Sequence, residues 1–174
     1  IKSKSIVTIH DLLFLKYPEF YNYIDRKIYH FKSKLACENA NTIIATSQQT
    51  KKDIIDFFNI TEEKIHVIYQ TCQSEFVTKC DDNTLENSVK NEIKSPFILY
   101  VGSIEERKNL IFLLKALKST NKEIRLICVG KKGIYYKQVS QFILKHKLEQ
   151  RVSFLNINDT KTLSILYQKS RALV

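Results

Sequence analysis

The chain has 174 residues, 44% of them hydrophobic and 26% charged, which is typical of a globular protein and excludes a disordered or low-complexity chain. No apolar run approaches the ~18 residues of a membrane span, which excludes a transmembrane helix within these residues. The net charge of +10 favours an anionic partner, such as nucleic acid, an acidic membrane surface or a phosphate-bearing small molecule, with a lysine-rich solvated surface as the alternative.

Strand and helix patterns alternate along the first seventy residues. Short runs rich in β-branched residues predict strands over 5–9, 42–46 and 65–69. Ser47 is a predicted N-cap, and the helix that it begins runs to about Phe58. This first part of the chain therefore has the pattern of an α/β lobe.

A longer helix is predicted over residues 21–40, because apolar side chains recur there at helical spacing. The apolar stripe consists of Ile24, Ile28, Phe31 and Leu35. We expect the stripe to cover the sheet. Basic residues share the same turns, so contact with anionic lipid is the alternative.

Residues 70–95 differ from the rest of the chain because they are polar and weakly periodic, and they end at Ser95-Pro96. We interpret this tract as the connection between two lobes. The predicted domains are 1–75, a linker over 76–95, and 96–174.

The second part of the chain alternates more regularly between strand and helix. The predicted elements are strands over 97–101, 124–129 and 151–155, helices over 109–118, 134–147 and 161–169, and the start of another strand at Leu173-Val174. Strict alternation at this spacing indicates parallel strands with right-handed crossovers. The fold class is therefore α/β, with two lobes that each contain a parallel sheet.

The four cysteines are Cys37, Cys72, Cys80 and Cys128. They are scattered and form no Cys-x-x-Cys pair, which indicates a reducing compartment and hence the cytoplasm. The histidines have no ligand spacing to one another or to a cysteine, so no metal site is predicted.

Gly102 follows the predicted strand over 97–101 directly, at the edge of a parallel sheet where ligands bind. Arg107 and Lys108 come next, at the predicted start of a helix. Two cations there oppose the positive end of the helix dipole unless an anion is bound. A diphosphate would supply that anion, and a solvated charged turn is the alternative.

His10 and Asp11 end the first predicted strand. The His10 imidazole could hydrogen-bond a substrate hydroxyl or phosphate, and Asp11 could fix its tautomer. The alternative is a loop in which Asp11 caps the next segment.

Four segments, in this order and spacing, resemble glycosyltransferase family 4. They are residues 8–12 with Tyr17-Pro18; 42–53 with 63–68; 99–110; and 148–155 with Leu163, Leu166-Tyr167 and 171–174. The resemblance implies a GT-B fold, which consists of two Rossmann-like lobes, and retaining transfer of a sugar from a nucleotide-diphosphate donor without an obligatory metal or other cofactor. It covers nearly the whole chain.

The resemblance also implies roles for individual residues. Lys108 would neutralise the donor diphosphate, assisted by Arg107 and the Gly102–Ser103 backbone. His10, with Asp11 beside it, would lie near the transferred sugar. The backbone at Asn156 and Ile157 would approach the nucleobase. Mannose from a guanine nucleotide, and a polysaccharide or glycolipid acceptor, are the family-level expectations, with peripheral contact at the inner face of an anionic membrane.

The sequence departs from the family pattern in three places. Ser103 stands where many relatives have arginine, and the usual glycine is absent from residues 69–73. The paired-glutamate segment of the family would begin beyond Val174, and early strands of the first lobe would precede Ile1. We therefore expect both lobes to be incomplete and the fragment to be inactive by itself. The alternatives are a basic nucleic-acid-binding module, although no nucleic acid is the expectation, and a degenerate transferase scaffold.

Overall fold

The computed structural model describes residues 3–79, 81 and 85–174, and divides the chain into two compact units, Ile1–Thr71 (unit 1) and Cys72–Val174 (unit 2). Each unit contains a three-stranded parallel sheet with its own buried core. The predicted α/β class with two parallel sheets is confirmed.

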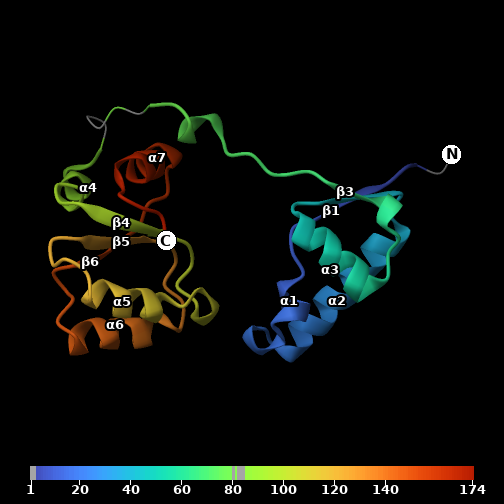
Figure 1. Ribbon diagram of the computed structural model, residues 1–174, viewed down its shortest axis with the longest axis horizontal. Helices are drawn as coiled ribbons and strands as arrows, with labels where there is room; N and C mark the ends of the chain where they lie inside the picture. The colour runs from blue at the N-terminus through green and yellow to red at the C-terminus, as the bar shows by residue number, and fades with distance from the viewer. Residues whose placement is uncertain (1–2, 80, 82–84) are drawn as a thin grey trace. The chain divides into compact units, whose positions relative to one another are not determined.

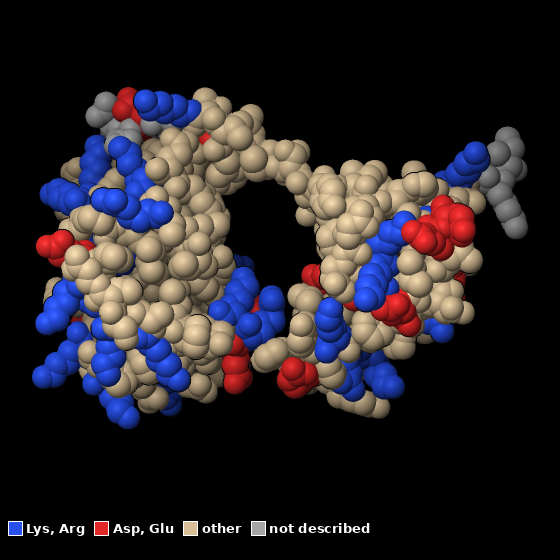
Figure 2. All heavy atoms as spheres, in the orientation of Figure 1, with Lys and Arg blue, Asp and Glu red and all other residues tan. Residues whose placement is uncertain are grey.

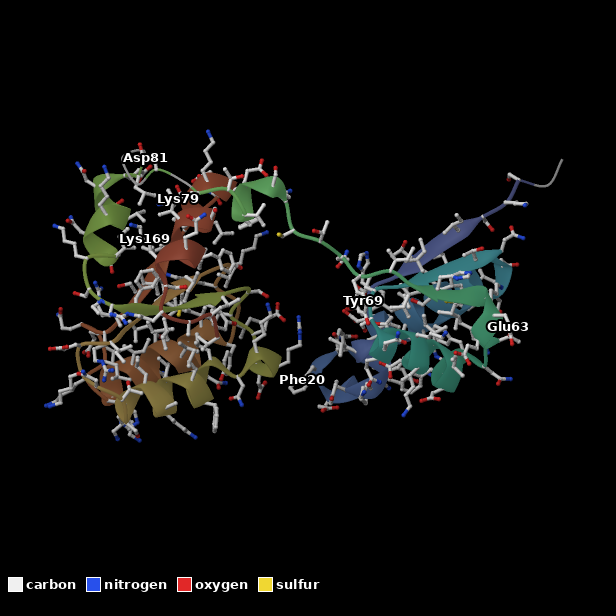
Figure 3. All side chains as sticks on the ribbon, turned by 45° about the horizontal axis from the view of Figure 1, so that its top comes forward. Phe20, Glu63, Tyr69, Lys79, Asp81 and Lys169 are labelled. Carbon is white, nitrogen blue, oxygen red and sulfur yellow. The ribbon has the colours of Figure 1, made fainter. Side chains whose placement is uncertain are left out.

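The strands of unit 1 have the order β1-β2-β3, and its helices lie on one side of the sheet (Figure 1). Its elements are β1 (Ile6–Ile9), α1 (Leu13–Lys16), α2 (Tyr23–Asn39), β2 (Thr42–Ala45), α3 (Gln48–Phe58) and β3 (Ile65–Val67). Glu63 and Tyr69, labelled in Figure 3, lie two residues before and two residues after β3. The Ser47 hydroxyl accepts a hydrogen bond from the Thr50 N–H at 3.0 Å, so the predicted N-cap is confirmed.

The apolar stripe of α2 faces away from the core, so the expectation that it covers the sheet is wrong. Ile24 is 66% exposed and Phe31 68%. The side of α2 that is turned inward is instead polar or small, and includes His30, which stacks on Phe58, and the buried Cys37. The periodicity predicted the helix correctly, but a single helix does not reveal which of its sides meets the sheet.

Unit 2 has the strand order β4-β5-β6, and its elements, like those of unit 1, alternate along the chain. They are α4 (Asn87–Glu92), β4 (Phe97–Val101), α5 (Leu110–Lys118), β5 (Arg125–Val129), α6 (Tyr136–Lys145), β6 (Val152–Leu155) and α7 (Thr160–Lys169). Leu173 forms a parallel bridge with Leu99, as expected for the start of a further strand beside β4.

Helices cover both faces of the second sheet (Figure 1). Leu114 of α5 and Val139 of α6 belong to one core cluster, and Val89 of α4 and Ile165 of α7 belong to another. The two clusters share no residue, because successive strand side chains point to opposite faces of a sheet. This is the layered arrangement of a doubly covered parallel sheet.

The interpretation of 76–95 as a linker is wrong for its second half. Leu85 and Val89 are 4% and 5% exposed and pack in the core of unit 2, and Val89 belongs to α4. The earlier part is also attached to unit 2, since the Gln168 side-chain nitrogen donates to the Thr78 carbonyl at 2.8 Å. Residues 80 and 82–84 of the predicted linker lie outside the described residues.

The excess positive charge lies mainly in unit 2. Figure 2 shows Lys and Arg spread over the drawn face of unit 2, whereas acidic and basic side chains alternate on unit 1. No helix among the described residues combines the length and the hydrophobicity that crossing a membrane would require.

Candidate functional site

The carboxyl ends of β4, β5 and β6 lie at one edge of the second sheet, because the three strands are parallel and paired in register. Gly102, Gly130 and Asn156 are the residues that follow these strands. Ligands of open parallel sheets bind at this edge, where the strands run into loops and helix N-termini. This edge is therefore the candidate ligand-binding edge of unit 2.

Gly102 and Lys108 lie against each other. The lysine side chain occupies the space where a Cβ of residue 102 would be, and its ammonium nitrogen would overlap that atom. The φ of Gly102 is also +149°, a conformation that other residues rarely adopt. Among the described residues, no carboxylate lies within ion-pair distance of the Lys108 ammonium group. The structure thus places an unpaired cation directly beside the loop backbone.

Arg107 and Ser103 both hold the Glu105 carboxylate. The Arg107 Nε donates to Oε2 at 3.1 Å, and the Ser103 hydroxyl donates to Oε1. The hydrogen bond from Ser103 is the largest cause that lowers the pKa of Glu105, followed by the charges of Arg107 and Lys108. Glu105 therefore stays ionised and orients Arg107, whose terminal nitrogens are left for another acceptor.

The sequence predicted the two cations at the start of α5. They lie instead in a separate 3₁₀ turn, Glu106–Lys108. Asn109 has a left-handed conformation (φ 50°) and separates this turn from α5, which begins at Leu110. Asn tolerates this conformation better than most residues, so the chain can change direction here. Both residues are consequently positioned by this turn rather than by the helix, and Arg107 is also held by Glu105.

The loops after β4 and β5 are in direct backbone contact. Gly102 N–H donates to the Val129 carbonyl at 2.8 Å, and Ile104 N–H donates to the Lys131 carbonyl at 2.9 Å. A Cβ at Gly130 would overlap the Gly102 carbonyl, so only glycine fits there without displacement. Sequence reasoning did not assign Gly130 to the site, although a glycine directly after a strand is a usable signal.

Tyr100 supports the same loop from within the core. Its hydroxyl donates to the Ser103 carbonyl at 3.0 Å, and burial raises its pKa to about 12. A cavity of about 300 Å³ lies beside the loop and is lined by Ile104, Glu105, Glu106, Gly133, Ile134, Tyr135 and Gln138. The predicted cations do not line this cavity, and its carboxylates would repel a diphosphate.

Asn156 and Ile157 directly follow β6, at the same edge of the sheet as Gly102. Asn156 is exposed, whereas Ile157 packs against the core beneath α7. Their backbone is therefore placed at the edge by the partly buried Ile157 side chain. The assignment of these residues to a nucleobase stays a prediction.

His10 and Asp11 lie in unit 1, at the end of β1, and both are exposed. Asp11 does not orient the imidazole through any contact that we observe, and its carboxylate instead accepts the Leu13 N–H at 3.1 Å, at the start of α1. The His10 Nδ1 instead lies 3.4 Å from the Gln70 side-chain nitrogen. Sequence reasoning missed Gln70.

Metal-ligating residues do not cluster in the described ranges, where no group of three His, Cys, Asp or Glu side chains is close enough to hold an ion. The described cysteines, Cys37, Cys72 and Cys128, are free thiols, and Cys80 lies outside the described residues.

Comparison with known families is decisive. Residues 81–174, more than half of the chain, match the family model described as "Glycosyl transferases group 1". The chain belongs to this family. Residues 2–72 match a second model, "Glycosyltransferase Family 4", so the two matches correspond closely to the two units.

Two curated relatives of this glycosyl transferase chain are bacterial O-antigen enzymes. The chain is 27% identical to the O-antigen chain mannosyltransferase RfbU of Salmonella typhimurium (strain LT2), over 97% of the chain and 44% of the relative. It is also 27% identical to the O-antigen chain mannosyltransferase B of Escherichia coli, over 98% of the chain and 46% of the relative. The chain thus spans less than half the length of these relatives.

Solved structures show the same fold. The Anabaena protein Alr3699/HepE in complex with UDP matches with a TM-score of 0.73 and 20% identity, over 99% of our chain and 46% of that protein. A glycosyltransferase from Rickettsia africae matches with a TM-score of 0.63 and 18% identity, over 97% of the chain and 44% of that protein. The predicted GT-B arrangement, present in part, is therefore confirmed for the fold.

Proposed function

We propose that this chain is part of a retaining glycosyltransferase that moves a sugar from a nucleotide-diphosphate donor to a polysaccharide or glycolipid acceptor. The observation that carries the proposal is the Lys108 ammonium group, held unpaired against Gly102 at the carboxyl end of β4. Membership of the glycosyl transferase family supports it. Because the chain spans under half of its curated relatives, the activity is proposed for the longer protein.

The reaction explains why cations are needed at this place. Negative charge develops on the diphosphate as the bond to the sugar breaks, and donors fixed in advance stabilise that charge without reorganisation. Lys108 supplies a point charge, and the free end of the Arg107 guanidinium supplies paired N–H donors for phosphate oxygens. Ser103 acts indirectly, because its hydroxyl donates to the Glu105 carboxylate that orients Arg107.

We propose mannose as the transferred sugar and a surface glycan or its lipid-linked precursor as the acceptor. The names of the two O-antigen mannosyltransferases support this choice. His10 and Asp11 are proposed to lie near the transferred sugar, and the backbone at Asn156 and Ile157 near the nucleobase. A guanine nucleotide is the expected donor, and UDP is the comparison ligand because a structural neighbour was solved with it.

Binding of pyrophosphate, GDP and UDP to the 174-residue protein tests the donor site. We expect Lys108→Ala to weaken all three ligands by about 10- to 100-fold, the loss expected for a charged hydrogen bond of about 1.5–3 kcal/mol. Lys115→Ala, on the exposed side of α5, is the matched control and should leave binding unchanged. Equal affinity of the Lys108 variant would contradict the site, and tight, salt-dependent binding of RNA or DNA instead would favour the nucleic-acid alternative.

Transfer is tested with the longer protein that contains this chain. NMR of the product should show the same anomeric configuration as in the donor, and the rate should survive EDTA, because we propose transfer without an obligatory metal or other cofactor. The isolated 174 residues should bind the donor without transferring the sugar. Inversion would contradict the retaining mechanism, and donor binding without transfer by the longer protein would indicate a degenerate scaffold.

We further propose a cytoplasmic location with peripheral contact at an anionic membrane. The free thiols of the described cysteines support the compartment. The exposed stripe of α2 supports the contact, because it carries Ile24 and Phe31 beside basic residues such as Lys27 and Lys32. Co-sedimentation with vesicles should increase with the fraction of anionic lipid and fall in Phe31→Ser. Equal binding to neutral vesicles would contradict this part of the proposal.

A further inference from the structure

The backbone of His10 is fixed by two hydroxyl groups from neighbouring elements. The Thr46 hydroxyl donates to the His10 carbonyl at 2.7 Å, and the Thr50 hydroxyl donates to the same oxygen at 3.1 Å. Thr50 is 4% exposed and belongs to α3, while Thr46 follows β2. The position from which the imidazole extends is therefore determined by β2 and α3 together.

The ring itself has one side-chain partner among the contacts observed for His10, and that partner is Gln70. The Nε2 atom of Gln70 lies 3.4 Å from the His10 Nδ1. An amide nitrogen carries only hydrogens to donate, so this contact is a hydrogen bond only if Nδ1 offers its lone pair. The two residues are 60 positions apart in the sequence and meet because β1 and β3 end at the same edge of the sheet.

We propose that Gln70 is a positioning residue that selects the tautomer of the His10 imidazole with the proton on Nε2. His10 then presents an N–H group, not a lone pair, to any molecule that reaches its free side. This inference rests on the proposed function, because it assigns the role of His10 toward the transferred sugar. In that role His10 donates a hydrogen bond to a hydroxyl of the transferred sugar and does not remove a proton.

The distinction matters chemically because a general base needs a lone pair on the atom that faces the substrate. Among the contacts observed for the described residues, Asp11 makes none to the ring, and its carboxylate accepts the Leu13 N–H. A carboxylate at Nδ1 would accept a hydrogen bond from Nδ1–H and leave the lone pair of the base on Nε2, as in a histidine–carboxylate pair. The amide of Gln70 produces the opposite tautomer.

The tautomer can be observed directly by ¹⁵N NMR of the histidine rings in the 174-residue protein at pH 8, above the ordinary pKa of imidazole. The exposed His66 of β3 serves as an internal reference for a solvated ring. We expect His10 to show a pyridine-type shift at Nδ1 and a pyrrole-type shift at Nε2, with a larger population of this tautomer than His66. Nδ1–H as the main form, or a mixture equal to that of His66, would overturn the proposal.

Two variants of Gln70 make the test specific. Gln70→Glu replaces the donor with an acceptor and should shift the proton of His10 to Nδ1, whereas Gln70→Leu should return His10 to the mixture of His66. Gln48→Glu adds the same charge at an exposed position of α3 and should leave the tautomer unchanged. An unchanged His10 spectrum in Gln70→Glu would also overturn the proposal.

A kinetic measurement links the tautomer to the reaction. In the longer protein, Gln70→Glu should lower kcat by about 10-fold or more and leave the KM of the donor nearly unchanged, since the lost donor acts at the sugar and not at the diphosphate. An unchanged kcat would overturn the role of His10 as a hydrogen-bond donor. Failure of diphosphate binding at Lys108 would refute the proposed function instead, while the NMR result on His10 would stand.

Discussion

Glu105 is a carboxylate placed where a second anion is proposed to bind. It holds Arg107 through Nε and thereby fixes the direction of the guanidinium group. The guanidinium group is thus oriented before the ligand binds, although the Glu105 carboxylate repels the proposed diphosphate to some extent. An ionised Glu105 therefore stabilises the folded loop as well as the arrangement of cations.

Glu105→Gln tests this stabilisation through its pH dependence. The folded-state pKa of Glu105 lies below its ordinary value of 4.5, so its contribution is present above that pH and is lost as the pH falls through the folded-state value. We expect wild type to melt at a higher temperature than Glu105→Gln at pH 7, with a difference that shrinks toward pH 3. Glu123→Gln, an exposed carboxylate elsewhere in unit 2, should show no such trend. A constant difference would contradict the assignment.

The cysteines should differ strongly in reactivity. Burial raises the pKa of the Cys37 thiol to about 11 and that of Cys128 to about 12, so neither forms the nucleophilic thiolate near neutral pH. Cys72 is exposed, beside Phe76 and Tyr167. Mass spectrometry after brief iodoacetamide treatment at pH 8 should find Cys72 alkylated and Cys37 and Cys128 protected. Early modification of Cys128 would show that the core of unit 2 opens readily.

At the scale of elements, α4 is fastened to the sheet by a polar cluster. Arg125 of β5 donates to the Glu92 carbonyl at 3.2 Å, and its guanidinium also pairs with the Glu92 carboxylate, which accepts the Ser153 hydroxyl as well. Among buried side-chain nitrogens and oxygens of the described residues, only the Arg125 Nε lacks a partner. The cluster is thus strong but not fully satisfied.

Arg125→Ala should lower the free energy of unfolding of unit 2 by about 1–3 kcal/mol, because Glu92 loses its charged partner while the unsatisfied nitrogen is removed too. Urea denaturation followed by circular dichroism measures the change. Lys94→Ala removes the same charge from an exposed position near α4 and should change stability by less than about 0.5 kcal/mol. Equal effects would mean that the cluster contributes charge but no specific bond.

Because the apolar stripe of α2 faces outward, substitution of its large side chains should have little effect on stability. Phe31→Ser should change the stability of unit 1 by less than about 0.5 kcal/mol, since the ring is 68% exposed. Phe58→Ala, which removes a ring that is 4% exposed and stacked on His30, should cost about 3–5 kcal/mol. Thermal denaturation of both variants compares them. Comparable losses would place the Phe31 side chain in the core.

Most strands could be predicted from the sequence, because β4 and β5 are nearly continuous apolar runs and a parallel sheet buries both faces. The loop at Gly102 could be predicted as well, since a glycine followed by charges ends a strand. Helix α4 was missed because its sequence is polar and contributes a single buried side chain, Val89. The packing of Val89 against the rest of unit 2 orders α4, and this contact cannot be read from the local sequence pattern.

The parts of the site that escaped prediction depend on three-dimensional contacts. The left-handed Asn109 places Arg107 and Lys108 in a turn of their own, and Asn is allowed but not obliged to adopt that conformation. Gln70 meets His10 only because two strands end at one edge. The direction of α2 likewise depends on its neighbours. Periodicity identifies an element, whereas the contacts of its neighbours decide its role.

At the scale of the whole molecule, every residue assigned to the donor diphosphate belongs to unit 2, which has two core clusters of its own. Residues 72–174, expressed alone, should therefore bind pyrophosphate within about threefold of the affinity of the 174-residue protein. Isothermal titration calorimetry measures both. A folded unit 2 that does not bind would show that the site needs residues from unit 1.

The contact between Gly130 and the Gly102 carbonyl has a consequence for variation in this protein. We assign no ligand contact to residue 130, yet the atoms of a single added methyl group would fall where the loop after β4 now runs. A mutant library that keeps only the ligand-facing residues constant would therefore vary Gly130 as if it had no role in the site. Any other residue at position 130 should give a folded protein in which the turn with Arg107 and Lys108 is displaced. The resulting loss of activity could easily be mistaken for the loss of a catalytic residue.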